Sequence, residues 1–435
     1  MKELGWKLAL LSTAMMLYTC QSSSSNLHPV ILIPGIVGNQ LEARLTSDYV
    51  PSSQSCKEPP QKLDDGWFRI WFDPSILLGP FTKCFSDRMM LYYDKDIDDY
   101  HNAPGVQIGV HRFGSTESLL FLNPALKDKT AYMARLVESL TEIGYEDGKT
   151  LFGAPYDFRY GLPAQGHPTH VGSKFLKDFK NLIEKASISN GGKPVILVSH
   201  SLGGLFALHL LNQNHLSWRQ KFIKHFVALS APWGGSVMEM LTFASGYTLG
   251  IPLIKPLQIR EAERSWESNF WLLPNPNNFG GEKPLVVTPN ATYSAHEISQ
   301  FFIDIGYPQG VYPYATRTMP LILEKLDAPG VPVTCIIGSG VKTPETLFYG
   351  ETGYDKQPKI VYGDGDGTVN MVSLLALESM WASEKNQILQ VLKVDGVDHL
   401  SILKDNVALS KIVDVISGIN SELISYVENI GVMGQ

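Results

Sequence analysis

The sequence predicts an α/β fold built around a parallel sheet, and two stretches of the chain carry this prediction. The apolar run 194–198 ends in small and polar residues, and an Ala- and Leu-rich amphipathic run over 205–211 follows at once. This order indicates a strand, a sharp turn and a helix. Later in the chain, the stretch 388–394 indicates a last strand that leads directly into the loop 396–400 with His399. Strands that alternate with helices in this way favour a parallel sheet with helices on its faces.

A serine, Ser201, stands at the sharp turn after the first of these strands. Its neighbours two positions before and after it are Ser199 and Gly203, and both are small. Small residues at these places let a strand and a helix approach closely around a strained turn that carries a nucleophilic serine. The usual pattern has glycine at both places, so Ser199 departs from it while keeping the position small. We therefore expect an α/β-hydrolase fold with Ser201 as the nucleophile.

On this fold the acid and the histidine follow the serine in the chain, each after a later strand. The loop 364–369 lies between a strand-like stretch, 359–362, and a helix-like stretch, 371–380, and His399 follows the last predicted strand. Asp366 is the preferred acid because it immediately precedes a Gly-Thr-Val turn that faces back over the sheet edge, and Asp364 is the alternative. The predicted catalytic triad is Ser201, Asp366 and His399.

An early apolar stretch indicates the second part of an oxyanion hole. Residues 28–33 predict a buried strand that opens into the glycine-bearing loop 34–39. In this fold one oxyanion donor is the amide after the nucleophile, and the other comes from such an early loop. The expected donors are the backbone amides of Leu202 and Ile36.

Length and composition are those of a large globular enzyme. The chain has 435 residues, of which 44% are hydrophobic and 18% charged, so we expect two domains or one domain with large insertions. The net charge of -7, without a sustained run of Lys or Arg, argues against nucleic acid as a partner. No side chains stand at the spacing of metal ligands, so neither a metal ion nor another cofactor is expected.

The N-terminus has the form of a targeting segment. Lys2 and Lys7 flank the start of an apolar stretch, 8–18, that is short for a membrane span. We expect residues 1–22 to be a signal peptide, with an uncleaved anchor as the alternative. The protein would then enter the secretory pathway and reach the extracellular space, or a vacuole or lysosome.

The cysteines and one glycosylation sequon are the next features that matter for a protein of the secretory pathway. Beyond the leader three cysteines remain, so at least one thiol is free. Cys335 lies in the apolar stretch 333–338 and is expected to be a buried thiol. Asn290 begins an Asn-Ala-Thr sequon in a polar stretch, which predicts a glycosylation site on a surface loop.

Five blocks resemble, in the same order, the signatures of the lecithin-cholesterol acyltransferase family, which includes a lysosomal phospholipase A2. They are PGIVGNQLEA at 34–43, APYDFR at 154–159, HSLGG at 200–204, APWGGS at 231–236 and GDGTV at 365–369. The resemblance runs from about residue 29 to the region of His399. It implies a fatty acyl transfer from a phospholipid ester to a sterol, another alcohol or water.

The resemblance also assigns residues. It implies Ser201, Asp366 and His399 as the triad and the amides of Ile36 and Leu202 as oxyanion donors. It further implies a disulfide between Cys56 and Cys84 that closes a membrane-binding loop. Members of this kind often have a second, C-terminal disulfide, which is not possible here because only Cys335 remains.

The segment 56–84 is rich in aromatic and aliphatic residues, among them Trp67 and Trp71. Tryptophan favours the boundary between water and lipid, so both are expected to contact a peripheral membrane surface. The alternative is a small satellite core. In the APYDFR block, Asp157 and Arg159 are expected to form a structural salt bridge.

The expected organisation is a hydrolase core interrupted by one insertion. Regularity is lost after the predicted strand 223–229, and long irregular segments in enzymes are usually functional. We expect a cap and lid over 232–330, between core segments 28–231 and 331–435. The expected function is a serine-dependent lipid acyltransferase or phospholipase. The alternatives are a soluble carboxylesterase and a non-catalytic lipid-binding protein of the same fold.

Overall fold

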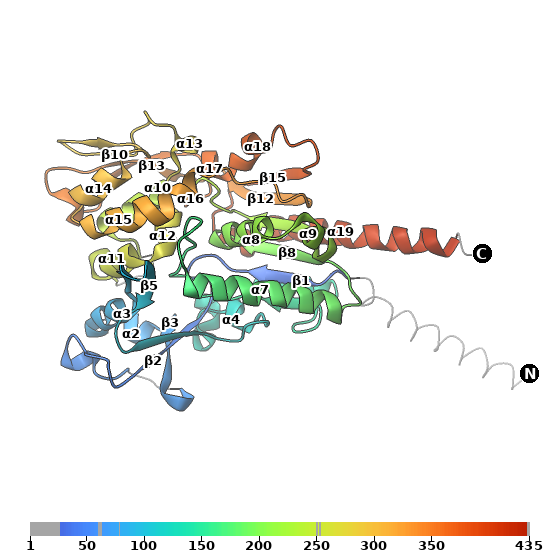
Figure 1. The fold of residues 1–435 in the computed structure, drawn as a ribbon, viewed down its shortest axis with the longest axis horizontal. Coiled ribbons are helices and arrows are strands. Elements are labelled where there is room, and N and C mark those ends of the chain that lie inside the picture. The colour runs from blue at the N-terminus through green and yellow to red at the C-terminus, as the bar shows by residue number, and fades with distance from the viewer. Residues whose placement is uncertain (1–26, 60–62, 78, 249–250, 252–253, 433–435) are drawn as a thin grey trace, which may run out of the picture.

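Six parallel strands form the sheet at the centre of the molecule (Figure 1). The computed structural model describes residues 27–59, 63–77, 79–248, 251 and 254–432. The sheet order is β15-β12-β9-β8-β1-β7. The strands are β1 (Val30–Ile33), β7 (Leu151–Gly153), β8 (Val195–His200), β9 (Ile223–Leu229), β12 (Val333–Ser339) and β15 (Leu389–Asp395).

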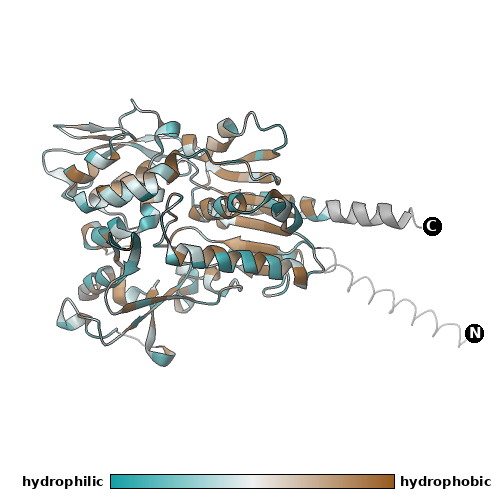
Figure 2. Cartoon of the chain, viewed as in Figure 1, coloured by the Kyte–Doolittle hydropathy of each residue, from teal (hydrophilic) through white to brown (hydrophobic). Residues whose placement is uncertain are grey.

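The inner strands are mostly apolar because helices cover both faces of the sheet, and β1 is apolar throughout. Ile31 and Ile33 belong to one core cluster, and the alternate residues Val30 and Leu32 belong to the other. Figure 2 shows these strands in the brown of hydrophobic residues, whereas the outer side of α7 is largely teal. The predicted strands at 194–198, 223–229 and 388–394 are confirmed.

The helices that flank the sheet divide between its two faces. On one face α7 (His170–Ser189) contacts α8 (Leu202–Gln213) and α9 (Leu216–Phe222). On the other, α6 (Ala134–Glu142) contacts α19 (Asn406–Val432). Leu136 and Leu140 of α6 share a core cluster with Ile412 of α19.

The remaining helices are mostly short. They are α2 (Pro74–Leu77), α3 (Thr82–Met89), α4 (Glu117–Leu120), α5 (Lys127–Thr130), α10 (Val237–Ser245), α11 (Pro256–Ser265), α12 (Glu267–Trp271), α13 (Pro276–Phe279), α14 (Ile298–Asp304), α15 (Val311–Pro313), α16 (Met319–Leu323), α17 (Met371–Leu374) and α18 (Ala376–Met380).

The segment 232–330 is more regular than the sequence suggested. It contains α10 to α16, which lie together at the upper left of Figure 1. It also supplies β10 (Val286–Val287) and β11 (Thr292–Tyr293) to a four-stranded sheet of order β11-β10-β13-β14. The strands β13 (Thr343–Phe348) and β14 (Lys359–Gly363) come from beyond residue 330. The predicted boundary at 330/331 therefore separates β10 from β13, its partner in this sheet.

A second small sheet is formed by the N-terminal part of the chain, and its strands β2 and β3 lie at the lower left of Figure 1. It has the order β3-β2-β6 and consists of β2 (Leu41–Leu45), β3 (Trp67–Trp71) and β6 (Val106–Val110), all antiparallel. A separate hairpin joins β4 (Leu91–Asp94) to β5 (Asp99–Asn102).

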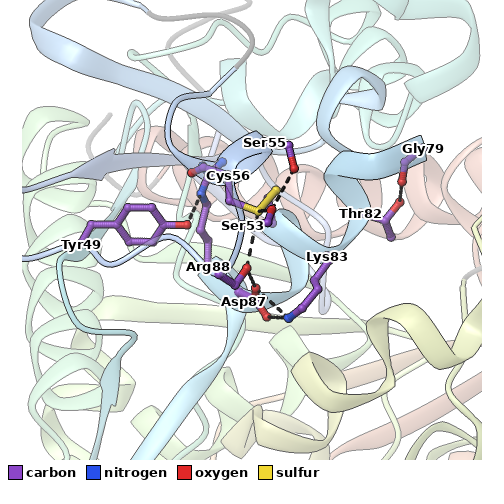
Figure 3. Close-up of a disulfide and its surroundings, with 11 residues drawn as sticks. Tyr49, Ser53, Ser55, Cys56, Gly79, Thr82, Lys83, Asp87 and Arg88 are labelled. Atoms are coloured by element: carbon purple, nitrogen blue, oxygen red, sulfur yellow. Dashed lines mark hydrogen bonds and ion pairs between the residues drawn. A yellow bond between two sulfur atoms is a disulfide. The ribbon is translucent and has the colours of Figure 1, made fainter.

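The disulfide between Cys56 and Cys84 is present, as the family resemblance implied. Figure 3 shows it beside Arg88, a buried side chain that is 1% exposed. The Arg88 guanidinium donates to the Cys56 carbonyl oxygen (Nη2 to O, 2.5 Å) and to the Tyr49 hydroxyl (Nε to Oη, 3.2 Å). In addition to the disulfide, these hydrogen bonds hold the segment around Cys56 against α3, which contains both Cys84 and Arg88.

The predicted signal peptide at 1–22 lies outside the described residues. Within the part of the chain that the structure covers, no helix is both long enough and apolar enough to cross a lipid bilayer.

Candidate active site

Ser201 occupies the sharp turn between β8 and α8. Its backbone has φ 53° and ψ -129°, a left-handed conformation that is strained for a residue with a side chain. The turn is possible because Gly203 passes close to the chain after β1. A Cβ on Gly203 would lie 2.4 Å from the Pro34 carbonyl oxygen. Ser199, in the place of the usual first glycine, is fully buried.

The loop after β15 brings His399 to Ser201. The His399 Nε2 lies 2.9 Å from the Ser201 Oγ, and its Nδ1 lies 2.7 Å from the Asp366 Oδ2. The carboxylate can only accept, so Nδ1 carries the proton toward Asp366 and Nε2 is free to accept from the serine hydroxyl. The structure thus brings together the three side chains of the predicted triad.

Asp366 is held as an ion by its surroundings. Its Oδ1 accepts from the backbone amides of Val369 (2.7 Å) and Thr368 (3.1 Å), and its Oδ2 faces the imidazole of His399. Burial alone would raise the pKa of this carboxyl, but the imidazole and the two amides outweigh burial and lower its pKa below the ordinary value.

Asp364, the alternative acid, has other partners. Its Oδ1 accepts from the amides of Gly340 and Gly365, each at 2.8 Å. These bonds brace the loop after β14 against the loop after β12. Among the two aspartates, the one that contacts His399 is therefore Asp366.

The early loop with Ile36 lies directly on the nucleophile turn. A Cβ on Gly35 would come within 2.8 Å of the Ser201 Cβ, so no larger residue fits there without displacement. Ile36 follows Gly35, and Leu202 is the first residue of α8, where amides have no partner within the helix. Leu202 thus follows Ser201 directly, and Ile36 follows the glycine that touches the Ser201 turn.

A cavity of about 340 Å³ opens beside Ser201 and His399. Its wall is mainly apolar and includes Ile36, Trp71, Met238, Ile251 and Leu272. Two lysines, Lys129 and Lys404, also line it and are exposed. An apolar cavity with a few polar groups is the usual form of a small-molecule site.

One carboxyl in this wall has no ion-pair partner among the described residues. Glu239, on α10, lines the cavity, and its Oε2 has no hydrogen-bond partner in the described part of the chain. Burial raises the pKa of Glu239 to about 8. Sequence reasoning did not single out Glu239, because a lone glutamate in a helix is ordinarily a surface residue.

The two tryptophans of the 56–84 segment lie in different environments. Trp67 is half-buried on β3, with the Arg44 guanidinium 5.1 Å from its ring. Trp71 differs from the expectation of a surface ring, since it is 5% exposed and lines the cavity, with Nε1 donating to the Val37 carbonyl oxygen (2.8 Å). The β2–β3 register shifts between Leu41 and Glu42, so both Ile70 and Trp71 turn inward.

Most of the segment between the two cysteines packs inward. Phe68, Ile70, Ile76 and Leu77 are all at most 2% exposed and belong to the main core cluster. These side chains therefore pack into the main core, and neither on a membrane surface nor in a separate satellite core. Leu63, by contrast, is 46% exposed on the approach to β3.

Three further residues that the sequence singled out lie away from the catalytic side chains. Asn290 is exposed in the turn between β10 and β11. Cys335 is a buried free thiol, and burial raises its pKa to about 12. Arg159 forms the expected salt bridge with Asp157 (Nη2 to Oδ2, 2.6 Å) and is fully buried.

Two buried polar residues at the site were not expected from the sequence. The Tyr132 hydroxyl lies 2.7 Å from the His200 Nδ1, and the His200 Nε2 lies 2.9 Å from the His399 carbonyl oxygen. The position of His200 next to Ser201 was visible in the sequence. No pattern marked Tyr132, which is brought to the site only by the fold.

The parallel sheet, the strained serine turn and the helical cap above them define an α/β-hydrolase. Comparison with known proteins then identifies the family: the model of lecithin:cholesterol acyltransferase matches residues 67–319 and 318–406. The chain belongs to the lecithin:cholesterol acyltransferase family.

Three curated relatives span most of the chain. Lecithin-cholesterol acyltransferase-like 1 of Arabidopsis thaliana is 58% identical over 96% of this chain and 96% of its own. Lysosomal phospholipase A and acyltransferase of Canis lupus familiaris is 37% identical over 90% of this chain and 91% of its own. Phosphatidylcholine-sterol acyltransferase of Mus musculus is 34% identical over 91% of this chain and 86% of its own.

Proposed function

We propose that this protein is a serine-dependent lipid acyltransferase and phospholipase, which takes a fatty acyl chain from a phospholipid ester. The observation that carries the proposal is the hydrogen-bonded series Ser201–His399–Asp366 at the wall of an apolar cavity. The names of the relatives support the substrate class, since they describe acyltransferases and phospholipases.

In the first half-reaction the Ser201 Oγ attacks the ester carbonyl carbon while its proton passes to the His399 Nε2. The tetrahedral oxyanion is stabilised by the amides of Ile36 and Leu202. Asp366 holds the imidazole in the required tautomer and stabilises its positive charge. The ester C–O bond then breaks, the leaving lysophospholipid oxygen takes the proton from His399, and an acyl-enzyme remains.

In the second half-reaction a hydroxyl compound attacks the acyl-enzyme and gives its proton to His399. Water releases a free fatty acid, whereas a sterol or another alcohol yields a new ester, and in both cases Ser201 recovers its proton. No metal ion or other cofactor takes part in these steps.

The proposal includes a cellular setting. A long-chain phospholipid resides in a membrane, so the protein docks on a membrane surface, with the exposed Leu63 and the half-buried Trp67 as the apolar contacts from the 56–84 segment. A signal peptide at 1–22, or an anchor there, directs the chain to the secretory pathway and on to the extracellular space, a vacuole or a lysosome. The disulfide and the exposed sequon at Asn290 support an oxidising, glycosylating compartment.

The test is incubation of the protein with phosphatidylcholine vesicles, with and without sterol, followed by analysis of every acyl product. The parent protein should release lysophospholipid and form fatty acid, sterol ester or both. Ser201→Ala should remain folded and lose about a millionfold in rate. Full activity of Ser201→Ala would contradict the serine mechanism. Activity only on short water-soluble esters would identify a carboxylesterase, and vesicle binding without any product a lipid-binding protein.

A further inference from the structure

A buried chain of hydrogen bonds connects three loops of the candidate site. The Gly35 amide lies 2.9 Å from the Tyr132 Oη, which lies 2.7 Å from the His200 Nδ1. The His200 Nε2 in turn lies 2.9 Å from the carbonyl oxygen of His399. Tyr132 is 8% exposed and His200 is 2% exposed, so their polar groups have each other as hydrogen-bond partners in place of water.

Only one arrangement of protons satisfies every member of this chain. The His399 carbonyl can only accept, so the His200 Nε2 carries a hydrogen. Burial, followed by the neighbouring charge of His399, lowers the pKa of His200 to about 3, so the ring is neutral and its Nδ1 is an acceptor. Tyr132 therefore donates its hydroxyl proton to His200 and accepts from the Gly35 amide. Burial also raises the pKa of Tyr132, which keeps the hydroxyl protonated.

This series of hydrogen bonds connects the backbone groups that must be aligned for acyl transfer. Gly35 precedes Ile36, the proposed oxyanion donor of the early loop. His200 precedes the nucleophile Ser201, and the carbonyl that it holds belongs to His399, the proposed base. The alignment of donor, nucleophile and base thus depends on two side chains outside the triad.

We propose that Tyr132 and His200 are positioning residues that align the oxyanion loop and the His399 loop with Ser201. This inference rests on the proposed function, because it assigns no chemistry of its own. Removal of the Tyr132 hydroxyl leaves the Gly35 amide and the His200 Nδ1 without this hydrogen-bond partner. The oxyanion loop and the His399 loop are then held less firmly. A displacement of about 1 Å at a reacting group costs on the order of a hundredfold in rate.

The central variant is Tyr132→Phe, which removes one oxygen and keeps the ring. We expect kcat on a lipid ester to fall about ten- to a hundredfold, with KM little changed, because the loss concerns the transition state and not ground-state binding. The matched control is Tyr145→Phe. Tyr145 is 1% exposed, and its hydroxyl donates to the His28 carbonyl oxygen and accepts from the Asn420 amide, both at 3.0 Å, away from the cavity. This control should lose comparable thermal stability and retain kcat.

A second readout separates alignment from a general structural role. An alkylboronic acid adds to the Ser201 Oγ as a tetrahedral anion, whereas the matching fatty amide stays trigonal. Tyr132→Phe should weaken boronate binding about as much as it lowers kcat/KM and leave amide binding unchanged. His200→Gln retains an N–H near the place of Nε2 and should keep more activity than His200→Leu. If Tyr132→Phe does not fold, the comparison of these two His200 variants tests the same inference.

The outcomes distinguish this inference from the proposed function. If the parent protein binds the boronate and Ser201→Ala does not, the serine mechanism stands. Under that condition, equal kcat and boronate affinity for Tyr132→Phe and Tyr145→Phe would overturn the positioning role. If boronate binding is the same with and without Ser201, the proposed function itself is wrong.

Discussion

Asp366 and Asp364 stand two positions apart in one loop and have different partners. Asp366→Asn should lower turnover by about four orders of magnitude, because an amide facing the His399 Nδ1 favours the wrong tautomer. Asp364→Asn should change turnover by less than tenfold, since the Asn oxygen can still accept from Gly340 and Gly365. Steady-state rates of both variants on one ester, with thermal unfolding as the check on folding, decide between them. Equal losses in two folded variants would contradict the assignment of the acid.

Glu239 makes the stability of the protein depend on pH. Its pKa is about 8 in the folded state, against an ordinary value of 4.5. Between these values the folded state keeps a proton that the unfolded state releases, so this group lowers stability as the pH rises from about 4.5 to about 8. Glu239→Gln removes this loss of stability. The melting temperature of the variant minus that of the parent should therefore increase from pH 4.5 to about pH 8.

Glu138→Gln provides the control for this pH series. Glu138 is an exposed residue of α6 that pairs with Arg135 on the surface. Its substitution should give no comparable trend with pH. A flat difference for Glu239→Gln as well would mean that Glu239 is ionised in the folded state.

At the scale of elements, β3 presents one tryptophan to the outside and one to the cavity. Burial of about 100 Å² of a Trp ring in lipid at about 25 cal/mol per Å² is worth at most about 2.5 kcal/mol, or up to about 70-fold in vesicle affinity. Trp67→Ser should therefore depress activity on vesicles far more than on a short soluble ester. Trp71→Ser should depress both, because the Trp71 ring lines the cavity.

Both substrates are measured on the same folded preparations, and direct vesicle binding is recorded alongside. Parallel losses for Trp67→Ser would mean that its ring supports the β3-β2-β6 sheet and not a membrane contact. A vesicle-selective loss for Trp71→Ser would contradict the role assigned to it in the cavity wall.

The elements that the sequence predicted well are those with a strong local pattern. β8 begins with four apolar residues and β9 ends with four, as is common for strands covered by helices on both sides. The edge strand β15 is interrupted by Gln390 and Lys393 and was predicted from its position before the loop with His399. Ser201 and His399 directly follow β8 and β15 of the parallel sheet, whereas Asp366 follows β14, an edge strand of the four-stranded sheet, and was predicted from the chain order alone. Local pattern and chain order were enough here because each side chain sits directly at a strand or loop end.

The features that were missed depend on contacts between distant segments. The short helices α12 and α13 owe their stability to packing in the cap, so no periodic pattern of their own marked them. The inward turn of Trp71 comes from a register shift with β2, and Tyr132 meets His200 across 68 positions of sequence. Such pairings are properties of the folded chain.

For the whole molecule, the exposed turn at Asn290 predicts a modified, secreted protein. On expression in a eukaryotic secretory system, the protein should lose mass on treatment with an N-glycosidase. Asn290→Gln should abolish this mass change, and so should Thr292→Ala, which keeps the asparagine but breaks the sequon. Both variants should fold, because Asn290 is exposed. An unmodified protein from such a system would contradict entry into that pathway.

The separation of the site residues along the chain has a consequence for synthesis on the ribosome. His399 follows Ser201 by 198 residues, and β12 must be in place before β15 can join the sheet beside it. During translation the proposed nucleophile and both oxyanion amides emerge long before the base. The growing chain is therefore expected to be inactive toward lipid until His399 has emerged. A product of premature termination before His399 is equally harmless to lipid, since it has a serine that nothing activates.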